Sequence, residues 1–461
     1  MSKYNKISFR DPSGFVFEKN NKIFRGINKS EKIFFDGIFS SKWFNKFLLD
    51  KKIQSFKITQ EITDSELYFL EHKKFQFPIL PNQFCAEQLY LGGLLTLEIA
   101  IEAIQNDVIL KDASAWNIFF NDSNPLFCDI TSFEEWDKSK NWYAYGQFAR
   151  HFIIPLIVFI YSNINVSRLF QVYQDGIKPE EAFKIIGLKS LLSLASLETI
   201  FLPNLFHRKK IYLNKINNKN NKGNEINKKI IISTLKRLRK YISSLKPSNF
   251  NQKDKWSDYI SNREHYSAKD ISEKRNFVEN AIDKKGLLVL DLSCNDGEFS
   301  ILAEKKGSYV IAADNDEMSL VNLQKKIQSQ NISVCNLDIL NPTPQIGFNN
   351  KENKSFIDRA KDNFDNVLFL GIVHHMTVTN KVPLDLIVEF LFNLTKNRVV
   401  FELIDKNDIK FIELSKQIKN VNFNLDRENF EKIIKDKFKI LKFKELHDNK
   451  RKLYLLEKIR N

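Results

Sequence analysis

Four residues that could form a ligand-binding loop follow an apolar segment in the stretch VLDLSCNDGEFS. They stand at alternate positions: Asp291, Ser293, Asn295 and Gly297. A strand that runs through a short polar turn into a helix is typical of a nucleotide-type cradle. Glycine allows the close approach of a ligand, and we expect exposed amides at the helix start to receive it. Only one glycine is present, which weakens a dinucleotide interpretation.

Two further predicted strands, YVIAAD and SVCNLD, also lead to carboxylates, Asp314 and Asp338. Asp314 lies some twenty residues after the first motif, where a carboxylate can accept hydrogen bonds from both ribose hydroxyls. Asp338 is placed for an adenine amino group. Three acidic strand ends make a poor pyrophosphate site. They favour a ligand with a ribose, an adenine and a positive charge but no phosphate, which describes S-adenosylmethionine.

The elements that position these residues alternate from about residue 251 onward. Strand and helix patterns follow one another, and the end of the chain (FKILKFKEL to KRKLYLLEKI) indicates two antiparallel strands. This order predicts an α/β fold, a doubly wound parallel sheet with an antiparallel edge hairpin. In such a sheet, ligands bind at the carboxyl ends of the strands.

From about residue 260 to the end, the chain resembles the class I S-adenosylmethionine-dependent methyltransferases, which have a Rossmann-like sheet. The resemblance rests on VLDLSCNDGEFS, VIAADND, LDILNPTP, LFLGIVHHM and VVFELIDKND. The family pattern is acidic-x-Gly-x-Gly-x-Gly, and Ser293 and Asn295 replace two of its glycines. The resemblance implies a methyltransferase whose cofactor contacts are Asp291, Ser293, Asn295, Gly297, Asp314 and Asp338. The alternative is a Rossmann-like domain that has lost its cofactor.

Candidate residues for the methyl acceptor follow the fourth and fifth predicted strands. His374 and His375 come after the fourth strand, where one imidazole could be a general base near neutral pH. They could equally pack the strand-to-helix corner. Glu402 lies on the fifth strand and is a second candidate base, or a structural hydrogen-bond acceptor.

The N-terminal half contains a second set of polar residues. Asp112 and Asn117 have the D-x4-N spacing of a kinase catalytic loop, and Asp129 follows the next strand. Asp112 would orient a hydroxyl, while Asn117 and Asp129 would hold magnesium against ATP phosphates. A long helix predicted over 86–106 and short strands over 118–120 and 126–128 provide the context.

In that context the N-terminal half resembles the kinase-like fold of the aminoglycoside-phosphotransferase type, an α+β domain. His-x-Asp, DFG, a glycine-rich loop and a Val-Ala-x-Lys strand are not found. Three alternatives stay open: an active ATP- and magnesium-dependent phosphotransferase, a degenerate substrate-binding or structural domain, and turn residues of an unrelated α+β domain.

Taken whole, the motif order resembles a group of bacterial class I methyltransferases with this N-terminal extension, whose acceptor is not established. The predicted divisions are a kinase-like domain over 1–205, a basic linker and amphipathic helix over 206–250, and a methyltransferase domain over 251–461. We expect a methyltransferase acting on a small molecule or a glycan. The alternatives are a bifunctional enzyme that is also a small-molecule or glycan phosphotransferase, and a non-catalytic interaction protein.

The positive charge is concentrated in one segment. Residues 201–250 hold thirteen basic and one acidic side chain, which is +12 of the net +15. An Asn/Lys-rich tract over 214–229 predicts a linker. The helix expected over 231–245 has an Ile/Leu stripe and a Lys/Arg face. Residues 228–246 could bind nucleic acid or an anionic membrane, or the helix could simply pack while its charges are solvated.

The rest of the composition limits other classes of function. Four cysteines lie far apart without zinc-ligand spacing, so no metal site is predicted, and reduced thiols suit the cytoplasm. No secretory signal is visible. The apolar run FIIPLIVFIY is too short to span a bilayer and predicts a buried helix. We therefore expect a cytoplasmic protein without a transmembrane segment.

Overall fold

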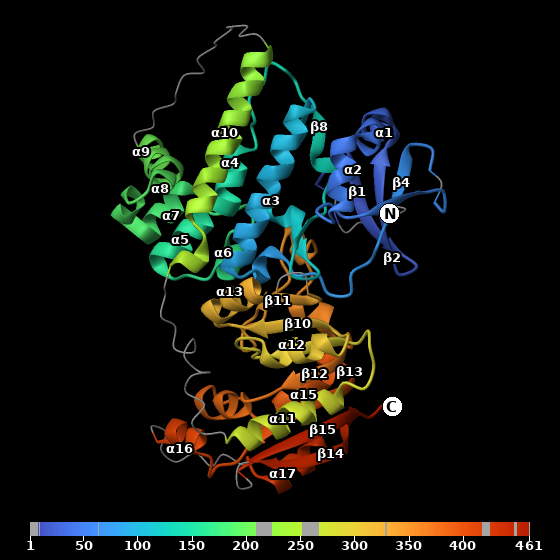
Figure 1. The fold of residues 1–461 in the computed structure, drawn as a ribbon, viewed down its shortest axis with the longest axis vertical. Helices are drawn as coiled ribbons and strands as arrows, with labels where there is room; N and C mark the ends of the chain where they lie inside the picture. The colour runs from blue at the N-terminus through green and yellow to red at the C-terminus, as the bar shows by residue number, and fades with distance from the viewer. Residues whose placement is uncertain are drawn as a thin grey trace. The chain divides into compact units, whose positions relative to one another are not determined.

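The computed structural model describes residues 8, 10–62, 64–208, 224–250, 267–327, 330–416, 425–446 and 450–460. The chain divides into an N-terminal unit, residues 1–252 with 346–353, and a C-terminal unit, residues 253–345 with 354–461 (Figure 1). Most of the predicted Asn/Lys linker, and residues 251–266 at the predicted start of the methyltransferase domain, lie outside the described residues.

The C-terminal unit is built on a seven-stranded sheet with the order β11-β10-β9-β12-β13-β15-β14. The five strands from β11 to β13 are parallel, and β15 runs antiparallel to both β13 and β14. The predicted doubly wound sheet with an antiparallel edge hairpin is therefore confirmed. The strands are β9 (Leu288–Leu292), β10 (Tyr309–Asp314), β11 (Ile332–Asn336), β12 (Phe364–Phe369), β13 (Thr395–Ile404), β14 (Phe438–Leu446) and β15 (Arg451–Lys458).

Both faces of this sheet are covered. Every residue of β9 and of β11 is buried, as expected for parallel strands between two layers of helices. The α-helices of the unit are α11 (Ala268–Ala281), α12 (Glu298–Lys305), α13 (Glu317–Lys326), α14 (Phe356–Ala360), α15 (Leu384–Leu394), α16 (Ile409–Ser415) and α17 (Arg427–Ile434).

The strand order places a binding crevice at the carboxyl end of β9. The chain moves from β9 to β10 on one side and later returns to β12 on the other side. Connections that leave in opposite directions open a space between them, and ligands of doubly wound sheets bind there. The loops after β9, β10, β11 and β12 all lead from this edge.

The N-terminal unit begins with a four-stranded antiparallel sheet of order β1-β2-β4-β3. Its strands are β1 (Gly14–Lys19), β2 (Lys22–Asn28), β3 (Phe56–Thr59) and β4 (Leu67–His72), with α1 (Lys32–Ser40) and α2 (Lys42–Leu49) between β2 and β3. The predicted hairpin is confirmed. Asn20 and Asn21 both have positive φ, as a tight two-residue hairpin turn requires.

Two short strand pairs follow α3 (Ala86–Gln105), one inside the other along the chain. β5 (Val108–Leu110) pairs with β8 (Phe133–Glu135), and β6 (Ile118–Phe120) pairs with β7 (Pro125–Phe127). The remaining α-helices are α4 (Tyr145–Phe148), α5 (Ile154–Ser162), α6 (Val166–Val172), α7 (Pro179–Ile186), α8 (Leu194–Ser196), α9 (Leu202–Arg208) and α10 (Asn224–Ser244). The apolar run before residue 162 is a buried helix, as predicted.

Helix α10 corrects the interpretation of the basic segment. The tract over 214–229 was expected to be a linker, but α10 already begins at Asn224. The Ile/Leu stripe of α10 is buried, and the helix packs along α3 within the N-terminal unit (Figure 1). The contact is close at Gly93, where a Cβ atom would lie 2.6 Å from Ile242 Cδ1. Packing of the apolar face is thus observed, whereas binding of nucleic acid or membrane stays a prediction.

Among the residues that the structure describes, no helix combines the length and the apolar character needed to cross a membrane.

Candidate functional site

A cavity of about 340 Å³ lies at the carboxyl edge of the sheet in the C-terminal unit. One half is formed by the carboxyl ends of β9 and β10 and by the loops after β9, β10 and β11, which contribute Asp291, Ser293, Asn295, Asp314 and Asp338. The other half is formed by α11 and by the segment after β12, which contribute Ile271, Lys274, Leu370, His375, Met376, Thr379 and Asn380. The fold thus brings most of the predicted cofactor residues to one cavity.

The backbone of the first loop keeps the conformation that glycine residues would allow. Ser293, Asn295 and Gly297 have φ values of +61°, +49° and +79°. A left-handed conformation costs a residue with a side chain on the order of 1–3 kcal/mol, and such strain is typical of functional sites. Asn295 offsets part of this cost, because its Oδ1 accepts a hydrogen bond from Asp296 N at 2.8 Å.

Gly297 is not among the lining residues. It lies where the loop packs against α13. A Cβ atom at this position would lie 2.4 Å from Leu323 Cδ1 on α13. Its contribution is therefore close packing between the start of α12 and α13, together with a positive φ.

The amides of the loop before α12 are used within the protein. Four consecutive amides, those of residues 294–297, are already paired, whereas a role for exposed amides at the start of α12 in receiving the ligand stays a prediction. Cys294 N donates to Ala313 O and Gly297 N donates to Cys294 O. Asn295 N donates to Asp314 Oδ2 at 2.8 Å, and Asp296 N to Asn295 Oδ1. The loop therefore uses these four amides within the protein and does not present them to a phosphate group.

The cavity carries an excess of negative charge. Over the ranges that the structure describes, its lining includes five carboxylates and one ammonium: Asp291, Asp296, Glu298, Asp314, Asp338 and Lys274. Burial raises the pKa of Asp291 to about 7, although Ser300 Oγ donates to its Oδ2 at 2.6 Å. Burial also raises the pKa of Asp314. In both cases burial disfavours the charged form, and the nearby charge of Asp314 acts in the same direction on Asp291.

Of the three candidate bases, only His375 lines the cavity. It begins a π-helical turn, His375–Thr379, whose residues form one wall. Burial, with a contribution from Arg451, lowers its pKa to about 4. The imidazole is therefore neutral at pH 7 and a weak base.

His374 and Glu402 lie beneath the wall rather than on it. His374 is 2% exposed, its ring centroid is 4.1 Å from that of His375, and burial lowers its pKa to about 3. Glu402 is fully buried, and Lys274 Nζ lies 2.8 Å from its Oε2, with Arg451 Nη1 3.7 Å from Oε1. Both oxygens of Glu402 thus have cationic partners within the protein, which fits a structural role.

Lys274 was missed by the sequence interpretation. It lies on α11, well before the first motif, and nothing in its sequence surroundings marks it. The structure places Nζ at the cavity and 5.2 Å from the centre of the Phe299 ring. Phe299 lies within the stretch VLDLSCNDGEFS and could have been found from its position.

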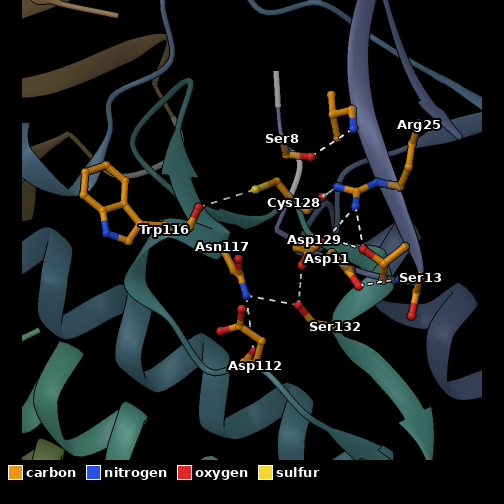
Figure 2. Close-up of polar contacts among 12 residues, drawn as sticks. Ser8, Asp11, Ser13, Arg25, Asp112, Trp116, Asn117, Cys128, Asp129 and Ser132 are labelled. Carbon is orange, nitrogen blue, oxygen red and sulfur yellow. Dashed lines mark hydrogen bonds and ion pairs between the residues drawn. The ribbon is translucent and has the colours of Figure 1, made fainter. Parts of the chain in front are cut away.

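The N-terminal unit also gathers its predicted residues, as Figure 2 shows for Asp112, Asn117 and Asp129. Asn117 Nδ2 donates to Asp112 O at 3.2 Å and to Ser132 Oγ at 3.1 Å. Burial and the nearby charge of Asp129 raise the pKa of Asp112. Its Oδ1 accepts hydrogen bonds from Ser114 N and Gln147 Nε2.

Asp129 is held by a residue that the sequence interpretation missed. Arg25, on β2, donates from Nη1 to Asp129 Oδ1 at 2.5 Å and to Thr131 Oγ1 at 2.7 Å (Figure 2). Thr131 Oγ1 and Ser132 Oγ also donate to Asp129. Burial alone would raise the pKa of Asp129, but these partners lower it. Arg25 is separated from Asp129 by 104 positions, so no local motif connects them.

These contacts determine whether Asp112, Asn117 and Asp129 could bind a magnesium ion. Three donors already use the oxygens of Asp129, and a guanidinium supplies the positive charge that a divalent cation would bring. In the described part of the chain, no group of three or more His, Cys, Asp or Glu side chains is arranged to hold a metal ion. The residues as placed do not fit an ATP–magnesium site.

Fold and site together define a class: a doubly wound α/β unit with an acidic cavity at its topological switch point. No family model matches the chain. The chain is 25% identical to the nodulation protein NoeA of Rhizobium meliloti (strain 1021), and the match covers 98% of this chain and 95% of that protein.

Two solved structures are similar to part of the chain. Magnesium protoporphyrin IX methyltransferase (ChlM) from Synechocystis PCC 6803 with bound SAH is 20% identical, with a TM-score of 0.31, over 42% of this chain and 86% of that one. N-methyltransferase NodS from Bradyrhizobium japonicum WM9 is 11% identical, with a TM-score of 0.31, over 42% and 99%.

Proposed function

We propose that the chain is an S-adenosylmethionine-dependent methyltransferase whose catalytic part is the C-terminal unit. The observation that supports this best is the combination of acidic strand ends with self-paired amides around one cavity. Such a cavity repels phosphate and suits a ligand with a ribose and a positive charge. The bound cofactor would supply an activated methyl group.

The residues of the cavity fit that cofactor. Asp314 and Asp338 would accept hydrogen bonds from the ribose and the adenine, and Ser293 and Asn295 present polar side chains in a strained loop. Asp291 would balance the positive charge. Methyl transfer is an in-line displacement that depends mainly on positioning. The acceptor, a small molecule or a glycan, would bind between α11 and the wall formed by His375 and Met376.

The test is calorimetric titration of the full chain with S-adenosylmethionine and with S-adenosylhomocysteine. We expect binding that Asp338→Asn weakens at least about tenfold, the size of one lost hydrogen bond to a charged group. Asp338 is preferable to Asp314, because Asp314 also accepts three backbone hydrogen bonds that hold the loop. Asp358→Asn, a change at an exposed helix-start carboxylate, is the matched control. Absence of binding by the unaltered chain would refute the proposal.

We propose no phosphotransfer activity for the N-terminal unit. Its Asp112, Asn117 and Asp129 come together, but their polar atoms are used by partners within the unit. We propose that this unit is a binding or structural domain of kinase-like organisation. A non-catalytic role for the whole chain would require that the C-terminal cavity retain no cofactor, which the same titration decides.

A further inference from the structure

Among the described residues of the chain, the half of the cavity that faces the acceptor contains no strong base. Glu402 is fully buried and held by Lys274 and Arg451. Lys274 Nζ donates in turn to Glu402 Oε2 and is part of this buried ion pair. His375 lines the wall as a neutral imidazole that is hard to protonate, because burial lowers its pKa to about 4. A hydroxyl group is too weak an acid to lose its proton near neutral pH without a base, whereas an ammonium group releases its proton to water far more readily. This wall therefore suits an amine better than an alcohol.

The charge of the cavity separates the remaining nucleophiles. Five lining carboxylates face one lining ammonium, and that ammonium is already paired with Glu402. Two of the carboxylates have cationic partners that do not line the cavity: Arg275 lies 2.5 Å from Glu298, and Lys326 lies 3.9 Å from Asp296. A carboxylate acceptor would enter a field of its own sign, whereas an ammonium group would be attracted.

The apolar residues of the cavity indicate that the part of the acceptor next to its charged group is apolar. Ile271, Phe299, Leu340, Leu370 and Met376 contribute to the lining, whereas Thr379 and Asn380 add neutral polar groups. A ligand with an apolar body and one basic nitrogen would therefore contact both the apolar residues and the carboxylates of the lining.

From this geometry we infer that the methyl acceptor is an amine, bound through its positive charge by the acidic cavity and methylated on nitrogen. The inference rests on the proposed function. The amine arrives as an ammonium ion and loses one proton to water. Its nitrogen lone pair then forms the bond to the methyl carbon while the carbon–sulfur bond breaks, its electron pair remaining on sulfur. The new ammonium product carries the positive charge that the sulfonium gives up.

Three probes of matched shape test the acceptor class by binding. The full chain, saturated with S-adenosylhomocysteine, is titrated with 2-phenylethylamine, 2-phenylethanol and phenylacetate by ligand-observed NMR. We expect the amine to bind at least about tenfold more tightly than either other probe, a difference of about 1.4 kcal/mol. An amine that binds no better than the alcohol or the carboxylate overturns the inference, and so does a lack of binding by all three.

Variants show whether the cavity charge is the cause. Glu298→Gln removes one lining carboxylate, and we expect it to reduce the affinity for the amine several-fold without changing that for the alcohol. The control is Glu279→Gln, which alters a carboxylate that pairs with Lys306 away from the cavity. Equal effects of the two variants would contradict the inference. Should S-adenosylhomocysteine fail to bind, the proposed function fails, and the three probes titrated alone still test the acceptor class.

Discussion

Lys274 and Glu402 form a buried ion pair, with 2.8 Å between Nζ and Oε2, that joins α11 to the centre of the sheet. The two residues are 128 positions apart in the chain. Arg451 approaches the other oxygen of Glu402 and also holds Asp408, with 2.8 Å between Nε and Oδ2. The helix that covers the cavity is therefore fixed to the sheet by a network of alternating charges rather than by apolar contacts alone.

Removing one member of this network should be costly. Lys274→Met leaves Glu402 buried with a more distant cation, and we expect the free energy of unfolding to fall by about 3 kcal/mol. Urea unfolding measures this change. Lys306→Met, which breaks the surface pair with Glu279, should cost less than about 1 kcal/mol. If Lys274→Met costs no more than this surface control, the ion pair does not stabilise α11 as described.

The strained loop predicts a conflict between stability and binding. Ser293 has a φ of +61°, and it is one of the residues that line the cavity. Ser293→Gly relieves the strain and should stabilise the fold by up to ~1 kcal/mol, because glycine adopts this conformation readily but also loses more entropy on folding. The same change removes a hydroxyl from the cavity and should weaken S-adenosylmethionine binding several-fold. Thermal unfolding and calorimetry are measured on the same preparations, and weaker binding combined with lower stability would contradict the explanation.

Binding of the cofactor should depend on pH through Asp291. Burial raises its pKa to about 7, so the folded chain holds a proton that the unfolded chain releases above its ordinary pKa. Asp291 therefore stabilises the ligand-free fold at low pH, and this contribution is lost as the pH rises toward 7. A positively charged ligand favours the ionised form, so affinity should increase between about pH 6 and pH 8.

The variant Asp291→Asn separates this effect from others. It cannot ionise, and its affinity for S-adenosylmethionine should be lower and nearly constant over the same pH range. Ligand-free Asp291→Asn should also lose less stability than the unaltered chain as the pH rises. A pH dependence that persists unchanged in this variant would assign the titration to another group, such as Asp314, whose pKa burial also raises.

The buried pair in the N-terminal unit makes a prediction about metal ions. Because Arg25 and two hydroxyls occupy the oxygens of Asp129, the full chain should bind no Mn²⁺ there, as followed by electron paramagnetic resonance with and without ATP. Arg25→Met should lower the free energy of unfolding by about 3 kcal/mol, since it leaves Asp129 without its cation. Mn²⁺ binding that Asp129→Asn abolishes would show instead that Arg25 yields its place to a metal.

The sequence alone determined the features that repeat locally. Alternating strand and helix patterns were sufficient to predict the parallel sheet, its edge hairpin and the acidic strand ends, because apolar periodicity is set by neighbouring residues. The same reasoning located the hairpin at Asn20-Asn21 and the helix that became α10. It failed at the first residues of α10, because Asn and Lys are polar and helical packing can override a weak local preference.

The tertiary structure decided everything that depends on distant residues. It paired Lys274 with Glu402 and Arg25 with Asp129, contacts that span 128 and 104 positions and leave no local signal. It turned the amides of the loop inward onto Asp314 and Asn295, which no composition could reveal. It also placed Glu402 and His374 behind the residues that line the cavity, whereas His375 lies in the lining. Burial and hydrogen-bond partners assign roles to side chains, and both exist only once the chain has folded.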